Sequence, residues 1–233
     1  MKAGLARALG VFLAGCWLAA AAPNSSVPNI EGPWQIITPG GALKPVDGPR
    51  PPFTAAGQAQ YDKNRADAKT LDPMRGCLPP GVPRLMMQPF PFNIVQGRTM
   101  YGMMFEWNHL NRVAYLRPDH VETIGPLYLG ESIGHWEGKT FVIDTNSFDK
   151  KDWLDDTGVP TSYDLHTVER LTLRNGGSEL EDRITIEDPT IFTKSWTAEL
   201  LFRKQPGRII KEDYCLGRMG LGKLAVKDAG ANP

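Results

Sequence analysis

The stretch LHTVERLTLRNGGSELEDRITIED, residues 165–188, decides the fold class of this chain. On both sides of residues 175–177, large apolar residues alternate with polar ones, which is the period of a half-buried β-strand. A glycine-rich turn between two such runs is typical of an antiparallel hairpin. We therefore predict two paired strands here, each with one face directed at a core.

Similar short runs, separated by turns, extend over most of the chain from Phe92 onward. They are TMYGMMFEW, RVAYLRP, PLYL, KTFVIDT, WTAELLFRK and RIIKEDYC, with turns expected at residues 134–138 and 205–207. Sequential strands joined by short glycine turns predict an all-β antiparallel meander. A closed barrel and a sandwich both fit this order, and we favour the barrel.

The N-terminus has a different composition. Residues 1–22 carry Lys2 and Arg7 before a short apolar run and small residues, the pattern of a secretory signal peptide and not of a membrane span. The run LAGC, which ends at Cys16, has the form of a lipoprotein signal, whereas residues 19–22 suit ordinary cleavage. We favour ordinary cleavage and a periplasmic or secreted protein, attached to a membrane only if Cys16 is lipidated.

Residues 23–91 form a long proline-rich segment. GPW at residues 32–34 opens a first strand, and Thr54 caps a helix that ends before Pro73. The apolar residues of this helix are mostly alanine, so we expect a surface helix. The expected organisation is a signal peptide (1–22), this segment packed on the barrel (23–91), the barrel (92–216) and a flexible tail (217–233).

Two cysteines remain after removal of the signal peptide: Cys77, in the loop CLPPGVPR, and Cys215. In an oxidising compartment an isolated pair is most often a disulfide. The crosslink would close most of the mature chain into one loop, which the chain-entropy model values at roughly 4–5 kcal/mol. We predict this disulfide, with the proline-rich loop packed across one end of the barrel.

The balance of charges limits the classes of partner. The chain has 26 basic and 26 acidic residues, so nothing marks it as a nucleic-acid binder. It lacks the close Cys or His spacing of a zinc site, and we expect neither a metal nor a cofactor. A metal held by His109, His135, His166 and a carboxylate is an alternative. The expected partner is a small-molecule ligand.

Glu169 stands out in the hairpin because it shares a face with Leu171 and Leu173. A carboxylate on an apolar face must be paired or have a raised pKa, which makes it a candidate acid or base. The alternative is a buried Glu–Arg pair. His166 and Arg170 share the opposite face, so in a regular strand Glu169 and His166 cannot point into one cavity.

An aromatic and methionine stripe suggests where a ligand binds. Tyr101, Met103, Phe105 and Trp107 share one face, which suits a planar or apolar ligand, although the same stripe also suits a plain core. With a two-residue tip at residues 109–110, Trp107 lies opposite Arg112. The candidate proton-transfer residues are Glu106, His109, His135, His166 and Glu169. The candidate ligand-binding residues are Arg112, which would hold an anionic or carbonyl group, Tyr101, Met103, Phe105, Trp107 and Trp136.

GESIG, residues 130–134, matches a nucleophile elbow around Ser132, and Asp144 and His166 follow in hydrolase order. The elbow requires a strand before it and a helix after it, but a turn and another strand are expected here. A serine hydrolase is therefore the less favoured alternative to a glycine-bounded strand end at the barrel rim.

Two resemblances bear on the fold. GPW, residues 32–34, is similar to the Gly-x-Trp entry of lipocalin-type barrels. CLPPGVPR, SIGHWEGKTFVIDT, LHTVER and TIEDPTIFTKSW together resemble a largely uncharacterised family of exported bacterial proteins over most of the mature chain. The resemblance implies an exported, lipocalin-like β-protein and no established activity.

The sequence thus predicts an exported β-barrel that binds a small apolar or aromatic compound. It would act on this compound by acid–base chemistry, as a lyase, isomerase or hydrolase. The alternatives are a non-catalytic ligand carrier and an envelope-associated structural protein.

Overall fold

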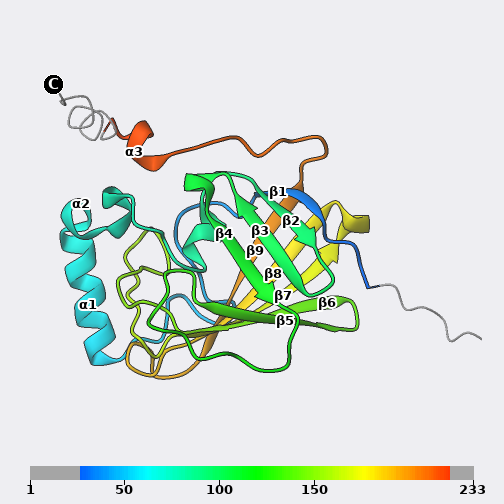
Figure 1. Cartoon of the computed structure of the whole chain (residues 1–233). Coiled ribbons are helices and arrows are strands. Elements are labelled where there is room, and N and C mark those ends of the chain that lie inside the picture. Colours follow the sequence, from blue (N-terminus) through cyan, green and yellow to red (C-terminus); the bar gives the residue numbers. More distant parts are fainter. Residues whose placement is uncertain (1–26, 221–233) are drawn as a thin grey trace, which may run out of the picture.

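The predicted hairpin lies in the wall of a closed barrel. The structure, a computed structural model, describes residues 27–220. The strands follow one another around the barrel in chain order, and β1 closes it by pairing with both β2 and β9 (Figure 1). They are β1 (Gly32–Ile36), β2 (Phe92–Gln96), β3 (Met100–Phe105), β4 (Asn111–Tyr115), β5 (Glu131–Glu137), β6 (Thr140–Asn146), β7 (His166–Arg174), β8 (Glu179–Glu187) and β9 (Trp196–Lys204). The prediction of a barrel is confirmed.

One junction in the barrel departs from the antiparallel meander. β4 and β5 are parallel and share only the pairs Ala114↔Ser132 and Tyr115↔Ile133, whereas the other neighbouring strands are antiparallel. A parallel pair needs a long connection, which residues 116–130 supply. We call this short junction the β4–β5 seam.

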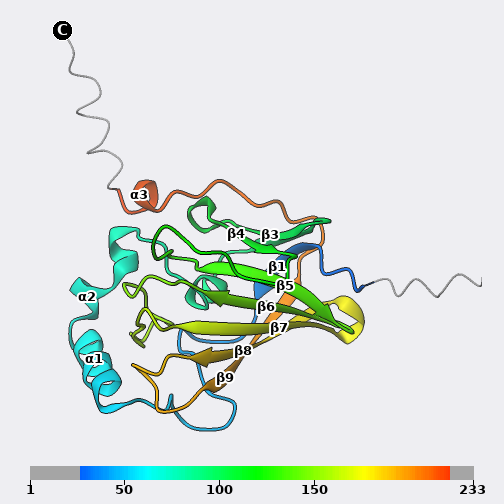
Figure 2. The same ribbon diagram turned by 60° about the horizontal axis from the view of Figure 1, so that its bottom comes forward.

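Several local predictions are wrong. PLYL forms only an isolated bridge through Leu127, and residues 134–137 of the expected turn belong to β5. RIIKEDYC is not a strand, because β9 already pairs with β8 on one side and with β1 on the other. Residues 205–214 instead run across the outside of the molecule, and we call them the C-terminal strap (Figure 2).

The β3–β4 connection is longer than the predicted two-residue tip. It contains the 3-10 turn η3 (Trp107–His109), so Arg112 pairs with Met103 and not with Trp107. Asn108 and His109 have positive φ angles of 50° and 49°, an uncommon conformation for residues other than glycine.

Alternate residues of the strands point into the barrel and form the core. Its largest side chains include Trp34, Phe92, Phe141 and Phe202, each no more than 1% exposed. Phe92 meets Phe202 edge-on, with 5.2 Å between ring centroids. The 3-10 turn η2 (Arg84–Met87) adds further buried side chains to the same core, so this turn of the proline-rich segment packs on the barrel.

The helices α1 (Ala55–Ala66) and α2 (Ala68–Leu71) lie outside one end of the barrel (Figures 1 and 2). As predicted, Thr54 caps α1: its Oγ1 accepts a hydrogen bond from the N–H of Gly57 at 3.0 Å. No helix in residues 27–220 is long and apolar enough to cross a membrane. The predicted signal peptide with Cys16 and most of the predicted tail, residues 221–233, lie outside the described range.

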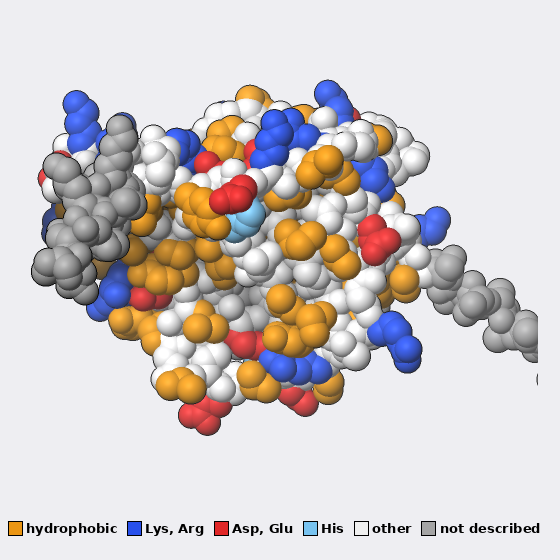
Figure 3. Space-filling view, turned by 45° about the horizontal axis from the view of Figure 1, so that its top comes forward, with side chains coloured by type: hydrophobic (Ala, Val, Ile, Leu, Met, Phe, Trp, Pro, Cys, Tyr) orange, Lys and Arg blue, Asp and Glu red, His pale blue; other side chains and the backbone are white. Residues whose placement is uncertain are grey.

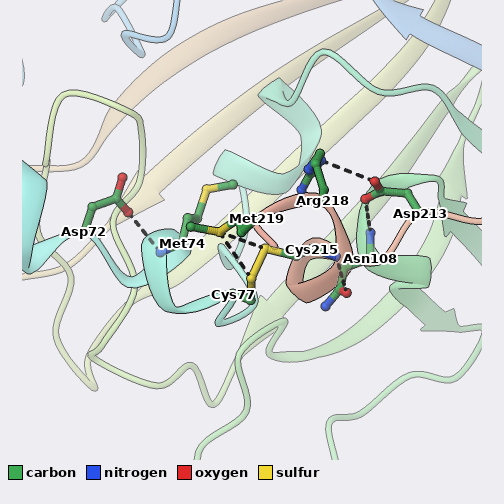
Figure 4. The surroundings of a disulfide bond; sticks show 8 residues. All are labelled: Asp72, Met74, Cys77, Asn108, Asp213, Cys215, Arg218 and Met219. Carbon is green, nitrogen blue, oxygen red and sulfur yellow. Dashed lines mark hydrogen bonds and ion pairs between the residues drawn. A yellow bond between two sulfur atoms is a disulfide. The ribbon is translucent and has the colours of Figure 1, made fainter. Parts of the chain in front are cut away.

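The predicted disulfide between Cys77 and Cys215 is confirmed (Figure 4). It joins the loop after the 3-10 turn η1 (Pro73–Gly76) to the short helix α3 (Cys215–Arg218), which follows the C-terminal strap. Asn108 supports the same junction, because its side-chain oxygen accepts a hydrogen bond from the N–H of Cys215 and its N–H donates to Asp213. A disulfide of this kind is consistent with an oxidising compartment.

Candidate functional site

The register of β5, β6 and β7 sorts their polar side chains between the two faces of the barrel wall. Thr145 and Glu169 face the interior and are 0% exposed, and Ser132 faces the same way. Asp144 and His166 face outward. The predicted separation of Glu169 from His166 therefore matches the placement of these two side chains on opposite sides of one sheet.

The outward-facing group is centred on Asp144. Its Oδ1 accepts a hydrogen bond from His166 Nε2 at 2.8 Å and another from His120 Nε2 at 2.9 Å. His120 is supplied by the β4–β5 connection, and its Nδ1 contacts Glu131, which also pairs with Arg117. Three segments distant in sequence thus place two imidazoles on one carboxylate oxygen.

These contacts determine the protonation of His120. Both of its ring nitrogens face carboxylates, which accept but do not donate hydrogen bonds, so these contacts favour the doubly protonated ring. Burial opposes this charge, but the hydrogen bonds to Glu131 and Asp144 outweigh it and raise the pKa of His120. Burial also acts to raise the pKa of Asp144, and hydrogen bonds from the two histidines bring that pKa below its usual range.

His166 has a different arrangement. With Nε2 donating to Asp144, a neutral His166 ring has its lone pair on Nδ1. That atom lies 3.8 Å from Glu187 Oε2, which is too far for a hydrogen bond. Within the described residues, His166 is therefore the histidine of this group with one ring nitrogen outside hydrogen-bond distance of a carboxylate.

A cavity of about 530 Å³ borders this group at the β4–β5 seam, where β4 has ended and β5 continues. Its apolar lining residues are Leu116, Pro118, Ile133 and Trp136, and its polar ones include Arg117, His135 and Asp144. The outer face of β3 and β4 beside it exposes Met100, Met104 and Tyr115. Figure 3 shows one face of the molecule, on which hydrophobic side chains are interspersed with basic and acidic ones.

The inward-facing group is a buried ion pair with an additional carboxyl. Arg112 Nη1 donates to Glu169 Oε1 at 2.9 Å, and Nη2 donates to Thr145 Oγ1 at 2.8 Å and to the second oxygen of Glu169. Asp182 is 0% exposed beside them, and neither of its carboxyl oxygens has a hydrogen-bond partner within residues 27–220. Burial and the neighbouring Glu169 carboxylate raise the pKa of Asp182 well above its usual range. Glu169 and Arg112 thus form the buried pair that was the alternative to a catalytic Glu169.

A second cavity, of about 540 Å³, lies between α1 and residues 150–162. Asp152 is among its lining residues, and its carboxyl oxygens have no hydrogen-bond partner in the described part of the chain. Burial and nearby Asp149 raise the pKa of Asp152 to about 8. No histidine lines this cavity, so the cavity at the seam is the better candidate for proton transfer.

Glu106 and His109 lie outside the Asp144 group and hold the C-terminal strap. Glu106 Oε2 accepts a hydrogen bond from the N–H of Lys211 at 2.9 Å, and His109 Nε2 lies 3.2 Å from the Lys211 carbonyl oxygen. The His109 ring also stacks on Tyr214, with 5.6 Å between centroids. Both predicted proton-transfer residues therefore have structural partners.

The predicted ligand-binding stripe faces the interior. Its members, Tyr101, Met103, Phe105 and Trp107, are all part of the buried core. Trp136, by contrast, is half-buried and borders the seam cavity while its indole N–H donates to the Tyr101 hydroxyl at 2.9 Å. Of the predicted ligand-binding residues, Trp136 is the one that lines this cavity.

The serine-hydrolase triad is not formed. Ser132 is 2% exposed and its Oγ lies 2.9 Å from Thr145 Oγ1 on the inner face of the barrel wall, whereas Asp144 and His166 meet on the outer face. Ser132 is also followed by the rest of β5 and not by a helix, so the elbow geometry is missing.

The histidines of the alternative metal site have separate partners. His109 contacts the strap, His135 contacts Glu137 at 3.2 Å, and His166 contacts Asp144. The described residues contain no group of three or more His, Cys, Asp or Glu side chains placed to hold a metal ion.

His120, Glu131 and Arg117 were not predicted as site residues from the sequence. The sequence did indicate that Asp144 and His166 share a side of the sheet. Strand alternation in KTFVIDT directs Phe141 inward and Asp144 outward, and alternation in the next strand directs His166 outward as well. His120 lies in an irregular connection, where no alternation of polar and apolar residues indicates the direction of a side chain.

No protein-family model matches this chain, and no curated protein matches it. Among solved structures, a similar one is apo lipid binding protein 8 of Caenorhabditis elegans, with 10% sequence identity and a TM-score of 0.38 over 80% of this chain and 100% of that one. A similarity of this size transfers neither a ligand nor an activity.

Proposed function

We propose that this protein is an exported β-barrel that binds a small molecule at the β4–β5 seam and acts on it by acid–base chemistry. The observation that supports the proposal is the pair of hydrogen bonds from His120 and His166 to Asp144, at the edge of a cavity of about 530 Å³. A histidine that is oriented by a carboxylate and has its other ring nitrogen free is a common arrangement for general-base catalysis.

Each member of the group has a distinct role in this proposal. Asp144 fixes the His166 ring through Nε2, and Nδ1, which lies on the Glu187 side of the ring, takes a proton from the substrate through water. His120, held between Glu131 and Asp144, fixes the Asp144 side chain and favours its ionised form. Arg117 lines the cavity and orients an anionic or carbonyl group.

The walls of the cavity favour an apolar or aromatic ligand. Leu116, Pro118 and Ile133 offer aliphatic surface, and Trp136 offers an aromatic edge. A second candidate function is ligand carriage without turnover. It is supported by the lining of the cavity, which includes Asp144 but neither of the two histidines bound to it.

The test uses mature, disulfide-bonded protein in D₂O with a pooled set of small carbonyl, hydroxy and ester compounds of apolar or aromatic character. Mass spectrometry reports deuterium uptake into a compound, or its conversion. We expect a change that Asp144→Asn and His166→Gln each reduce by about 100-fold or more, which is the usual size of general acid–base contributions. The control is Glu199→Gln, on an exposed outer pair with Arg183, and it should leave the rate unchanged.

Native mass spectrometry on the same mixtures separates the two candidates. Bound compound without deuterium uptake or conversion would support the carrier function. If the folded protein neither binds nor converts any of the compounds, both candidate functions are wrong.

A further inference from the structure

β5 has a free edge at the seam. Its last pair with β4 is Tyr115↔Ile133, but β5 runs on to Glu137, where it is paired only with β6. Residues 134–137 therefore have β6 on one side and no strand on the other within the described part of the chain, and residues 134–136 line the seam cavity. At about 3.3 Å of rise per residue, this edge is roughly 10 Å long.

The β5–β6 turn determines which backbone groups face the cavity. Only Gly138 and Lys139 separate the strands, so Glu137 and Thr140 form the hydrogen-bonded pair that closes a two-residue hairpin. Hydrogen-bonded and non-hydrogen-bonded pairs alternate along an antiparallel ladder. The N–H and C=O of Trp136, and the C=O of Gly134, consequently point away from β6 and toward the seam.

These groups have no backbone partner at the seam within residues 27–220. They present an acceptor, a donor and an acceptor in a row, which is the pattern that an extended peptide backbone complements. Gly134 and Trp136 both line the cavity, and Leu116 and Pro118 provide apolar surface beside the edge. The exposed neighbours His135 and Glu137 are polar, which disfavours pairing with the edge of a second barrel.

We infer that the seam binds a short extended peptide segment, which adds to the free edge of β5 with its carbonyl on the Trp136 N–H and an apolar side chain in the cavity. This inference rests on the proposed function in that it names the ligand class of the same cavity. It places about three residues of the peptide along β5, beside Asp144.

The test begins with the free protein. Hydrogen–deuterium exchange should be fast at the amide of Trp136 and slow at the amides of His135 and Glu137, which pair with β6. A library of N-acetylated, C-amidated tetrapeptides with aliphatic or aromatic residues is then added to the mature protein. Bound peptides, found by native mass spectrometry, should slow exchange at Trp136 at least 10-fold.

Matched variants separate the backbone contact from the side chain. Trp136→Ala retains the N–H, whereas Trp136→Pro removes it at an edge position where proline is tolerated. We expect the Pro variant to bind peptide at least 10-fold more weakly than the Ala variant. Because Trp136→Pro could fail to fold, ester analogues that lack single peptide N–H groups test the reciprocal contacts, to the C=O groups of Gly134 and Trp136, on the native protein. We expect a loss of 5-fold or more in binding at one position.

The outcomes distinguish this inference from the proposed function. If non-amide compounds bind in an Asp144-dependent way, but peptides neither bind nor slow exchange at Trp136, the inference is wrong and the proposed function stands. Peptides that bind without slowing that exchange, or ester analogues that all bind equally well, also overturn it.

Discussion

Arg112 of β4 and Glu169 of β7 form an ion pair inside the barrel, where their side chains are 2% and 0% exposed. The pair connects strands that are not neighbours in the sheet, so it spans the interior. Breaking a buried pair by removal of one partner typically costs 3–5 kcal/mol, because the other charge remains buried and unpaired.

We therefore expect Glu169→Leu to lower the free energy of unfolding by about 3–5 kcal/mol. The double variant Arg112→Met/Glu169→Leu should recover most of this loss, since no unpaired charge remains. Urea denaturation measures both. The control pair, Arg183 and Glu199, is 45% and 42% exposed, and its removal should cost less than about 1 kcal/mol. Equal effects at the two pairs would contradict the burial argument.

Asp182 gives a prediction about pH. Its pKa is raised in the folded state by burial and by Glu169, so folding takes up a proton at this site. The resulting stabilisation is present below the unfolded-state pKa, near 3.9, and is lost as the pH rises from there through the folded-state pKa. Asp182→Asn mimics the protonated acid. It should be more stable than the parent at pH 7, and the difference should shrink as the pH approaches 4.

Urea denaturation at a series of pH values measures this difference. Asp152 also has a raised pKa, so the parent alone would show a mixed dependence, and the comparison must be between parent and variant. A stability difference between parent and Asp182→Asn that does not change with pH would mean that Asp182 is already ionised in the folded protein.

The sequence pattern predicted the wall of the barrel better than its closure. Alternation around residues 165–188 predicted that Glu169 faces inward and His166 outward, because a regular strand leaves no other choice. Closure depends on β1, which pairs with β9 from the opposite end of the chain, and local periodicity does not report such pairings. The pairing of Glu169 with Arg112 also joins two strands that are distant in sequence, and local periodicity does not predict it. Arg112 was therefore expected to bind a ligand instead.

The candidate site was less predictable because much of it lies outside regular strands. His120 comes from the irregular β4–β5 connection, and the cavity exists because β4 ends before β5 does. The stripe around Met103 illustrates a further limit: alternation shows that side chains share a face, but only the packing decides whether that face is a pocket or a filled core.

The contacts of His120 predict how it titrates. Burial lowers the pKa of His120, and the hydrogen bonds to Glu131 and Asp144 raise it by more, so the imidazolium should persist above the usual range. NMR titration of the ring protons should give a midpoint above 6.5 in the parent and a lower one in Glu131→Gln. The stabilisation from this charge is present below the unfolded-state pKa and is lost as the pH rises through the folded-state pKa. A midpoint that stays the same in Glu131→Gln would show that this contact does not form in solution.

The disulfide gives a prediction about the C-terminal strap. Cys77 and Cys215 are 138 residues apart, and the chain-entropy model assigns roughly 5 kcal/mol to a crosslink that closes so long a loop. Cys77→Ala/Cys215→Ala should lose a large part of this in urea denaturation. Amide hydrogen exchange at Lys211 should also be faster in the double variant, because contacts to Glu106 and His109, and no covalent link, then hold this part of the strap. Met219→Leu, which changes a sulfur 3.5 Å from Cys77 and leaves the disulfide, is the control. Two alkylatable thiols in exported protein, or a double variant as stable as the parent, would contradict this role.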